Sequence, residues 1–128
     1  MPHLTLDYSA NLEALCDVSK LCDHLRLAAI STGVLPLAGV RVRAFCATHV
    51  SIADGAEDNI YLDISVRLRA GRDIETRKAA TKLIFEAAQE FLAPVIATHP
   101  IALSMEMRDI DPDLAPKLNT IRDHLKKD

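Results

Sequence analysis

The second residue of the chain is a proline, and it stands directly before a segment with strand-like alternation, HLTLDY at positions 3–8. Proline has no main-chain N–H group, so it fits a strand only at the first residue or on an edge. A chemical role is the alternative. With Met1 removed, Pro2 would carry a free secondary amine, a group that accepts and donates a proton near neutral pH. The residue by itself leaves both interpretations open.

Arginines stand at two places where a predicted strand meets a turn. VRVRAF at 40–45 alternates Arg41 and Arg43 with apolar residues, and AGR places Arg72 directly before a predicted helix. Guanidinium groups stay charged and form bidentate pairs with carboxylates, and a helix N-terminus itself favours anions. From the residues alone, Arg41 and Arg43 fit a solvated strand face, and Arg72 fits an anchor of the turn.

The first half of the chain has the order strand, helix, strand. The predicted elements are a strand at 3–8, a helix at 9–32, a strand at 40–50 and a loop at 51–58. Apolar residues at spacings of three and four define the amphipathic helix. Ser9 or Asn11 is expected to cap its start, and Gly33 suits its end.

The second half repeats this order. Its predicted elements are a strand at 59–71, a helix at 72–92, a strand at 100–110 and a short C-terminal helix at roughly 117–127. Asp73 is a good N-cap for the long helix, and Pro94 should end or kink it. Leu118, Ile121 and Leu125 are expected to face inward from the C-terminal helix.

A doubled β-α-β order at an interval of about 60 residues indicates a duplicated architecture. We expect one domain over residues 1–128, with pseudo-repeats at roughly 2–50 and 59–110. The predicted fold is an α/β two-layer sandwich of the α+β kind, in which both helices cover one face of a four-stranded sheet. The other face would remain uncovered, and apolar residues there would favour association into an oligomer.

Composition excludes several classes of function. The 128 residues have a formal net charge of −3, which gives no support for bulk attraction to nucleic acid or membranes. No apolar run approaches the roughly 18 residues of a membrane span, and the start of the chain does not resemble a signal peptide. We therefore expect a cytoplasmic protein. Cys16, Cys22 and Cys46 are expected to be free thiols, since a zinc site of Cys16, Cys22 and His24 would lack metal-ligand spacing.

Four features occur together in this chain: Pro2 opens the first strand, GVRVR opens the second, AGR closes the third, and the β-α-β unit is doubled. In this combination the chain resembles the tautomerase superfamily, and within it the 5-carboxymethyl-2-hydroxymuconate isomerase family of homoprotocatechuate degradation. The stretches with the resemblance are MPHLTLDYSANLE, STGVLPLAGVRVRA, ADG and LRAGRDIETR. They extend over nearly the whole length.

The resemblance implies a chemical role for each of three residues. In this family the processed N-terminal proline is a general base, which moves a proton between positions of a dienol and an unsaturated ketone with no metal or organic cofactor. Pro2 and Arg41 would be catalytic, and Arg72 would bind an anionic unsaturated keto or enol dicarboxylate or tricarboxylate. Arg41 would face the developing oxyanion or the 2-oxo acid end, and Arg72 a distal carboxylate. Desolvation and nearby cations would lower the pKa of the prolyl amine toward ambient pH.

The two halves differ in their functional residues. The first half has Pro2 and Arg41 but no arginine in the turn DYSANLE, whereas the second half has Arg72 and no free N-terminus. The halves would therefore supply one complete set per chain. The family implies a homotrimer that resembles a hexamer of the shorter tautomerases. Whether Arg72 serves its own chain or a neighbour stays open.

Other functions remain possible from the sequence. A free prolyl amine could serve another keto-enol acid tautomerase, a hydratase or a dehalogenase, and the fold could also be a non-catalytic oligomeric binding module. Arg43, Arg67 and Arg69 are assigned to a solvated strand face. The five histidines are scattered, and a substrate contact by His3 or His49 is the minor alternative.

Overall fold

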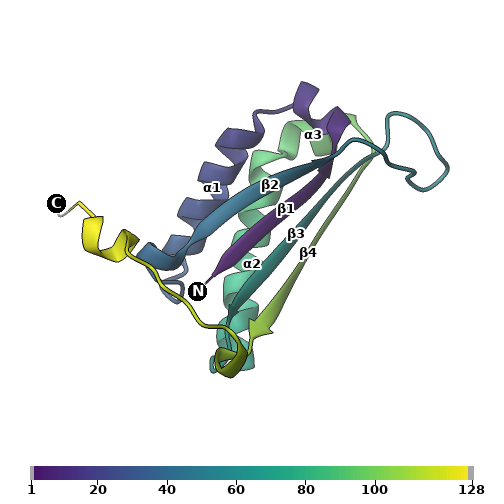
Figure 1. Cartoon of the computed structure of the whole chain (residues 1–128). Coiled ribbons are helices and arrows are strands. Elements are labelled where there is room, and N and C mark those ends of the chain that lie inside the picture. The colour runs from purple at the N-terminus through teal and green to yellow at the C-terminus, as the bar shows by residue number, and fades with distance from the viewer. Residues whose placement is uncertain (1, 127–128) are drawn as a thin grey trace.

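The computed structural model describes residues 2–126 and contains one four-stranded sheet with two long helices on one face (Figure 1). The strands are β1 (His3–Ser9), β2 (Arg41–Ala47), β3 (Ile60–Arg69) and β4 (Ile101–Ile110). The α-helices are α1 (Val18–Ser31), α2 (Ile74–Phe91) and α3 (Ala93–Thr98). Short 3₁₀ turns are η1 (Ala10–Ala14), η2 (Leu37–Gly39), η3 (Pro112–Leu114) and η4 (Ile121–His124).

The strands are arranged in the order β2-β1-β3-β4. β1 pairs in parallel with β2, and β3 pairs in parallel with β4, so each half is a β-α-β unit as predicted. The two halves meet where β1 pairs antiparallel with β3, with His3 opposite Arg67. The predicted two-layer fold, with both helices on one face, is therefore confirmed (Figure 1).

The hydrophobic core lies between the sheet and the two long helices. Alternate residues of the two central strands are buried there against α1 and α2. The buried set includes, from the strands, Leu4, Leu6, Leu62, Ile64 and Val66 and, from the helices, Leu21, Leu25, Ile84 and Ala88. Each fully buried aliphatic side chain of this size stabilises the fold by about 1.5–3 kcal/mol. Because strand side chains alternate, burial of this set commits the intervening residues to the opposite face.

That opposite face is polar, so the prediction that apolar residues there would favour association is wrong. The strand register aligns side chains in rows across the sheet; one row is Arg41, His3, Arg67 and Arg108, and another is Phe45, Asp7, Asp63 and Ser104. The alternation sends nearly every aliphatic side chain to the helix side. Any contact on the open face would therefore depend chiefly on polar and charged groups.

The predicted helix at 9–32 is two elements rather than one. A 3₁₀ turn, η1, follows β1, and α1 begins only at Val18. The N-cap of α1 is Asp17, whose carboxylate accepts a hydrogen bond from the main-chain N–H of Lys20 at 3.2 Å. An acidic N-cap is favourable at the positive end of the helix dipole.

Ser9 and Asn11, the two expected caps, instead connect β1 to the start of β3. The Ser9 hydroxyl donates to Oδ1 of Asn11 at 2.7 Å and accepts from the main-chain N–H of Tyr61 at 3.0 Å. The Asn11 amide donates to the carbonyl oxygens of Asn59 at 2.8 Å and Glu57 at 3.2 Å. These bonds hold the long β2–β3 connection against the end of β1.

The boundaries of α2 agree with the sequence. Asp73 caps the helix, because its carboxylate accepts from the main-chain N–H of Thr76 at 2.7 Å. The helix ends at Phe91, and Pro94 lies in the first turn of α3. Proline is tolerated there because the first turn of a helix leaves its N–H groups unpaired.

The predicted C-terminal helix at 117–127 is wrong within the described residues, and residue 127 lies outside them. The segment has no regular secondary structure apart from η4. Leu118 is 90% exposed and Leu125 40% exposed, so these side chains do not pack inward in the single chain. Asn119 fixes the segment through a 2.8 Å hydrogen bond to the carbonyl oxygen of Ala38.

In the part of the chain that the structure describes, no helix is long and apolar enough to cross a membrane. Cys16 and Cys22 are half-buried and Cys46 is exposed, and all three are free thiols, as predicted. No group of three His, Cys, Asp or Glu side chains within residues 2–126 is arranged to hold a metal ion.

The substitution Ser9→Ala should lower the free energy of unfolding by about 1–3 kcal/mol, because it leaves the N–H of Tyr61 without its acceptor in a buried place. The matched control is Ser31→Ala, at an exposed hydroxyl on the last turn of α1, where the change should stay within about 0.5 kcal/mol. Chemical denaturation measures both. Equal losses for the two variants would contradict the role of Ser9.

Candidate active site

Pro2 and Arg41 lie side by side at the start of the β1–β2 pair. Pro2 is buried directly before β1, and Arg41 is the first residue of β2. The main-chain N–H of Arg41 donates to the carbonyl oxygen of Pro2 at 3.3 Å. The fold thus brings together the main chains of the two residues that the resemblance assigns to catalysis. Met1 lies outside the described residues.

Arg72 occupies the turn between β3 and α2, where its guanidinium is used by the main chain. Nε and Nη2 donate to the carbonyl oxygen of Val34 at 3.2 and 2.8 Å, and Nη1 donates to the carbonyl oxygen of Arg69 at 3.0 Å. These bonds connect the segment after α1 to the β3–α2 turn. Within one chain these bonds favour the turn-anchor alternative for Arg72.

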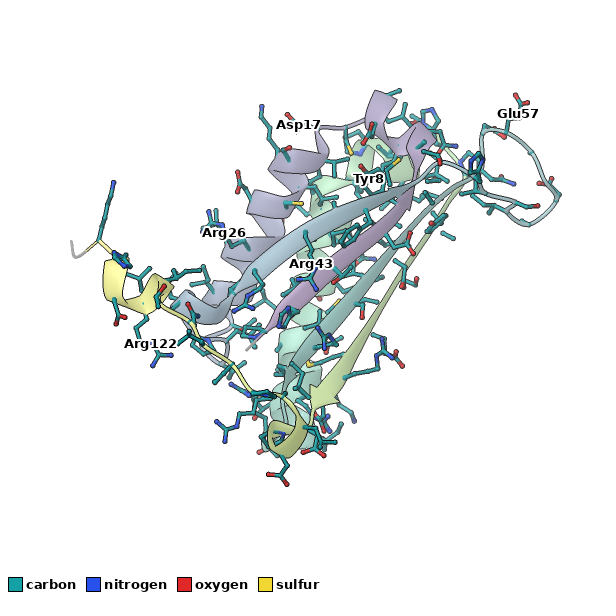
Figure 2. The ribbon with its side chains drawn as sticks, in the orientation of Figure 1. Tyr8, Asp17, Arg26, Arg43, Glu57 and Arg122 are labelled. Carbon is teal, nitrogen blue, oxygen red and sulfur yellow. The ribbon has the colours of Figure 1, made fainter. Side chains whose placement is uncertain are left out.

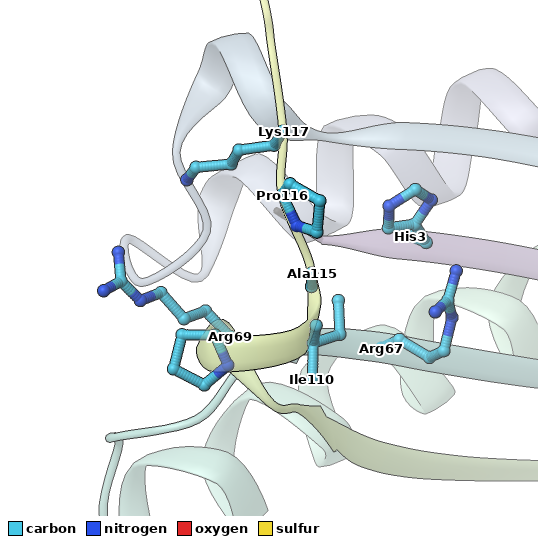
Figure 3. A pocket seen from close by; sticks show the side chains of 8 residues that line it. His3, Arg67, Arg69, Ile110, Ala115, Pro116 and Lys117 are labelled. Atoms are coloured by element: carbon cyan, nitrogen blue, oxygen red, sulfur yellow. The ribbon is translucent and has the colours of Figure 1, made fainter.

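A cavity of about 320 Å³ opens on the polar face of the sheet beside the start of β1 (Figure 3). It is lined by His3, Arg67, Arg69, Ile110, Pro112, Ala115, Pro116 and Lys117, and we call it the basic cavity. His3 and Arg67 come from the adjacent strands β1 and β3, and the segment after β4 forms the apolar wall (Figure 3). Three elements far apart in sequence therefore converge next to Pro2.

His3 is a neutral imidazole at the edge of this cavity. Its pKa is lowered from 6.5 to about 4, first by burial and then by the positive charges of Arg41, Arg67 and Arg43. Nη1 of Arg43 lies 3.2 Å from Nδ1 of His3. Because a guanidinium only donates, Nδ1 accepts this bond and the neutral ring carries its proton on Nε2. His3 is thus a hydrogen-bond donor without a charge.

Charge is segregated along the open face of the sheet. The basic side chains gather at the end where β1 begins, and Asp7 and Asp63 lie opposite each other four residue pairs along from His3 and Arg67. Figure 2 shows Tyr8 and Glu57 at the far end of the molecule, Arg122 near the C-terminal segment, and Arg43 between them. The hydroxyl of Tyr8 donates to Glu13, far from Pro2. An anionic ligand would be attracted to the basic end.

Sequence reasoning missed Arg67, Arg69 and Lys117 as possible site residues. The two arginines were assigned to a solvated strand face, and both are indeed exposed on that face. Their alternation in VRLR places them on the same side as His3, but only the antiparallel β1–β3 pairing brings His3 next to Arg67. Nothing in the sequence indicates that Lys117 returns to this place.

Comparison with solved structures defines the class of protein. The chain superimposes with a TM-score of 0.59 on the wild-type W0 fused 4-OT, solved as a symmetric trimer; the two share 17% identity, with 88% of this chain and 91% of that chain covered. At this identity the likeness concerns the fold alone, which is the tautomerase fold.

The family follows from closer relatives. The family model for 5-carboxymethyl-2-hydroxymuconate isomerase matches residues 2–125. The 5-carboxymethyl-2-hydroxymuconate Delta-isomerase of Escherichia coli is 30% identical over 121 residues, which cover 94% of this chain and 96% of the relative. A crystal structure of a 5-carboxymethyl-2-hydroxymuconate delta-isomerase has a TM-score of 0.92 at 26% identity, with 100% of this chain and 95% of that chain covered. The chain belongs to the 5-carboxymethyl-2-hydroxymuconate isomerase family and is an isomerase of the tautomerase superfamily.

The lowered pKa of His3 makes stability depend on pH. An unfolded histidine titrates near its ordinary value of 6.5, whereas the folded value is about 4. The unfolded state therefore binds more protons in this window, so the contribution of His3 is fully present above pH 6.5 and is lost as the pH falls through 4.

We expect His3→Gln to reduce the acid dependence of the free energy of unfolding between pH 6.5 and 4, as measured by chemical denaturation. His124→Gln, at an exposed position of η4, is the control and should leave the dependence as in the unsubstituted protein. The assignment fails if both variants lose the same free energy on acidification, or if the imidazole of His3 titrates near pH 6.5 by NMR.

Proposed function

We propose that this isomerase acts on 5-carboxymethyl-2-hydroxymuconate, and that Pro2, freed by removal of Met1, is its general base. The main observation in support is the position of Pro2, which is buried at the start of β1 in main-chain contact with Arg41 and beside the basic cavity. The activity of the Escherichia coli relative agrees with this substrate. The proposal places the enzyme in homoprotocatechuate degradation in the cytoplasm.

The proposed reaction moves one proton along a conjugated chain. The amine of Pro2 takes the proton from the hydroxyl of the dienol, which leaves a dienolate. The resulting ammonium then returns the proton to a carbon further along, and the unsaturated ketone forms. The amine is regenerated, so neither a metal nor an organic cofactor is required. Positioned acid–base catalysis of this kind contributes about 10²–10⁴-fold to the rate.

Two features of the site would bring the pKa of the amine toward neutrality. Burial disfavours the charged ammonium, and the cationic side chains of Arg41, Arg43 and Arg67 gather on the face beside it. The lowered pKa of His3, the next residue, reports the same two causes. An amine with a pKa near ambient pH is both available as a base and effective as an acid afterwards.

The arginines are proposed to bind the charges of the substrate. Arg41, next to Pro2, would stabilise the negative charge that develops on the dienolate oxygen, or the adjacent 2-oxo acid group. Arg72 would bind a distal carboxylate, and to do so its guanidinium would exchange the carbonyl oxygens of Val34 and Arg69 for the substrate. Such an exchange could take place in the same chain or in a neighbouring subunit.

A homotrimer is part of this proposal. The face of the sheet opposite the helices is uncovered in the single chain, and the fused 4-OT of the same fold was solved as a symmetric trimer.

Blocking the amine of Pro2 should abolish most of the activity. We expect an alanine inserted before Pro2 to lower kcat/KM by about 10²–10⁴-fold, because the amine becomes an amide and loses its basicity. Isomerisation is followed by ultraviolet absorbance, with protein whose mass confirms loss of Met1 as the control. Equal turnover by the blocked and the processed protein would rule out Pro2 as the base.

Arg41 and Arg72 should differ in the kinetic constant that they affect. Arg41→Met should lower kcat by about 10²-fold, since it removes a group that acts on the transition state. Arg72→Met should chiefly raise KM, the signature of lost substrate binding.

Arg122→Met, an exposed arginine on η4, is the control for charge alone. Thermal unfolding of Arg72→Met separates its turn-anchor role from binding. A fall in kcat for Arg72→Met at unchanged KM would contradict the binding role.

A further inference from the structure

The basic cavity contains none of the three residues with an assigned role. Pro2, Arg41 and Arg72 do not line it, whereas Arg67, Arg69 and Lys117 do. Among the described residues that line it, none is acidic. The cavity therefore concentrates positive charge beside the proposed base without taking part in the mechanism so far.

These three charges have no acidic ion-pair partner among the residues that the structure describes. Within residues 2–126, Arg67, Arg69 and Lys117 form no ion pair, whereas their neighbour Arg108 lies 3.4 Å from Glu106 and Arg77 lies 2.9 Å from Asp109. Like charges held around one cavity repel each other, and the repulsion is relieved when an anion enters. The geometry is suited to a ligand with negative charge.

The remaining walls define what kind of anion fits. Ile110, Pro112, Ala115 and Pro116 give one apolar side, formed by the segment that crosses the sheet after β4 (Figure 3). An apolar wall excludes water and strengthens the electrostatic attraction. His3 adds an uncharged donor on the side of β1. A carboxylate on a short carbon arm matches these surfaces better than a fully hydrated inorganic ion.

We propose that the basic cavity binds the carboxymethyl arm of the substrate and is the subsite that distinguishes a tricarboxylate from a dicarboxylate muconate. This inference rests on the proposed function. Arg41 and Arg72 are proposed for two of the three carboxylates, and the third enters the cavity between Arg67 and Lys117. His3 links the proposed base to the basic cavity, because it follows Pro2 in the chain and its side chain lines the cavity.

The test compares two substrates in one double variant, Arg67→Met with Lys117→Met. Methionine keeps an unbranched apolar stem and removes the charge. For 5-carboxymethyl-2-hydroxymuconate we expect KM to rise at least about tenfold, as for the loss of a hydrogen bond to a charged group, while kcat is retained. For 2-hydroxymuconate, which lacks the arm, KM should stay as in the unsubstituted protein.

Arg108→Met is the matched control. Arg108 is opposite Arg67 on β4 and shares the open face, but it does not line the cavity. Its replacement should leave both KM values unchanged. The proposal is overturned if the double variant raises KM equally for both substrates, or if Arg108→Met has the same effect as the double variant.

A binding measurement separates this inference from the proposed function. Propane-1,2,3-tricarboxylate is titrated into the full chain by calorimetry, with the imidazole of His3 observed by NMR. Binding that weakens in the double variant and not in Arg108→Met supports the subsite. If the processed protein also turns over neither muconate, the proposed function is wrong and the subsite still stands. Binding that is equally strong in the double variant overturns the subsite.

Discussion

The antiparallel pairing of β1 with β3 is the constraint on which the rest of the structure depends. It joins two parallel β-α-β units into one sheet and places the beginning of β1 against the end of β3, so that His3 lies opposite Arg67. The start of β1, with Pro2, thereby becomes the neighbour of the β3–α2 turn and of the chain that leaves β4. Without this register the basic residues of the two halves would lie apart.

The same alternation that builds the core also builds the charged face. The burial of Leu4, Leu6, Ile64 and Val66 against the helices stabilises the fold. This stabilisation offsets the repulsion between the cations that the strand register places close together on the other face. The strand register fixes the main-chain positions of the strand cations beside one another, and such pre-organisation lowers the ordering cost of binding. The gathering of Arg41, Arg43 and Arg67 around His3 contributes to the lowered pKa of its imidazole.

Local signals in the sequence predict an element well when its partners are also local. Asp73 caps α2 through Thr76, three residues away, and the prediction is confirmed. Ser9 and Asn11 have the same capping chemistry, yet their partners lie about fifty residues away at the start of β3, so the predicted helix start is wrong. The prediction of a C-terminal helix is wrong for a related reason. Asn119 donates to the carbonyl oxygen of Ala38, a residue of η2 that lies far away in the sequence.

By itself the sequence determined the order of the four strands and two long helices, the apolar side of each strand and, through its resemblance, the family. These depend on periodicity and on motifs that are contiguous in the chain. The catalytic roles of Pro2 and Arg41 stay predictions. Only the tertiary structure decided that Arg72 donates to Val34 and Arg69, and that Arg67, Arg69 and Lys117 surround one cavity with His3. The physical reason is that a charge's partners are set by strand order and register, which depend on contacts between residues far apart in sequence.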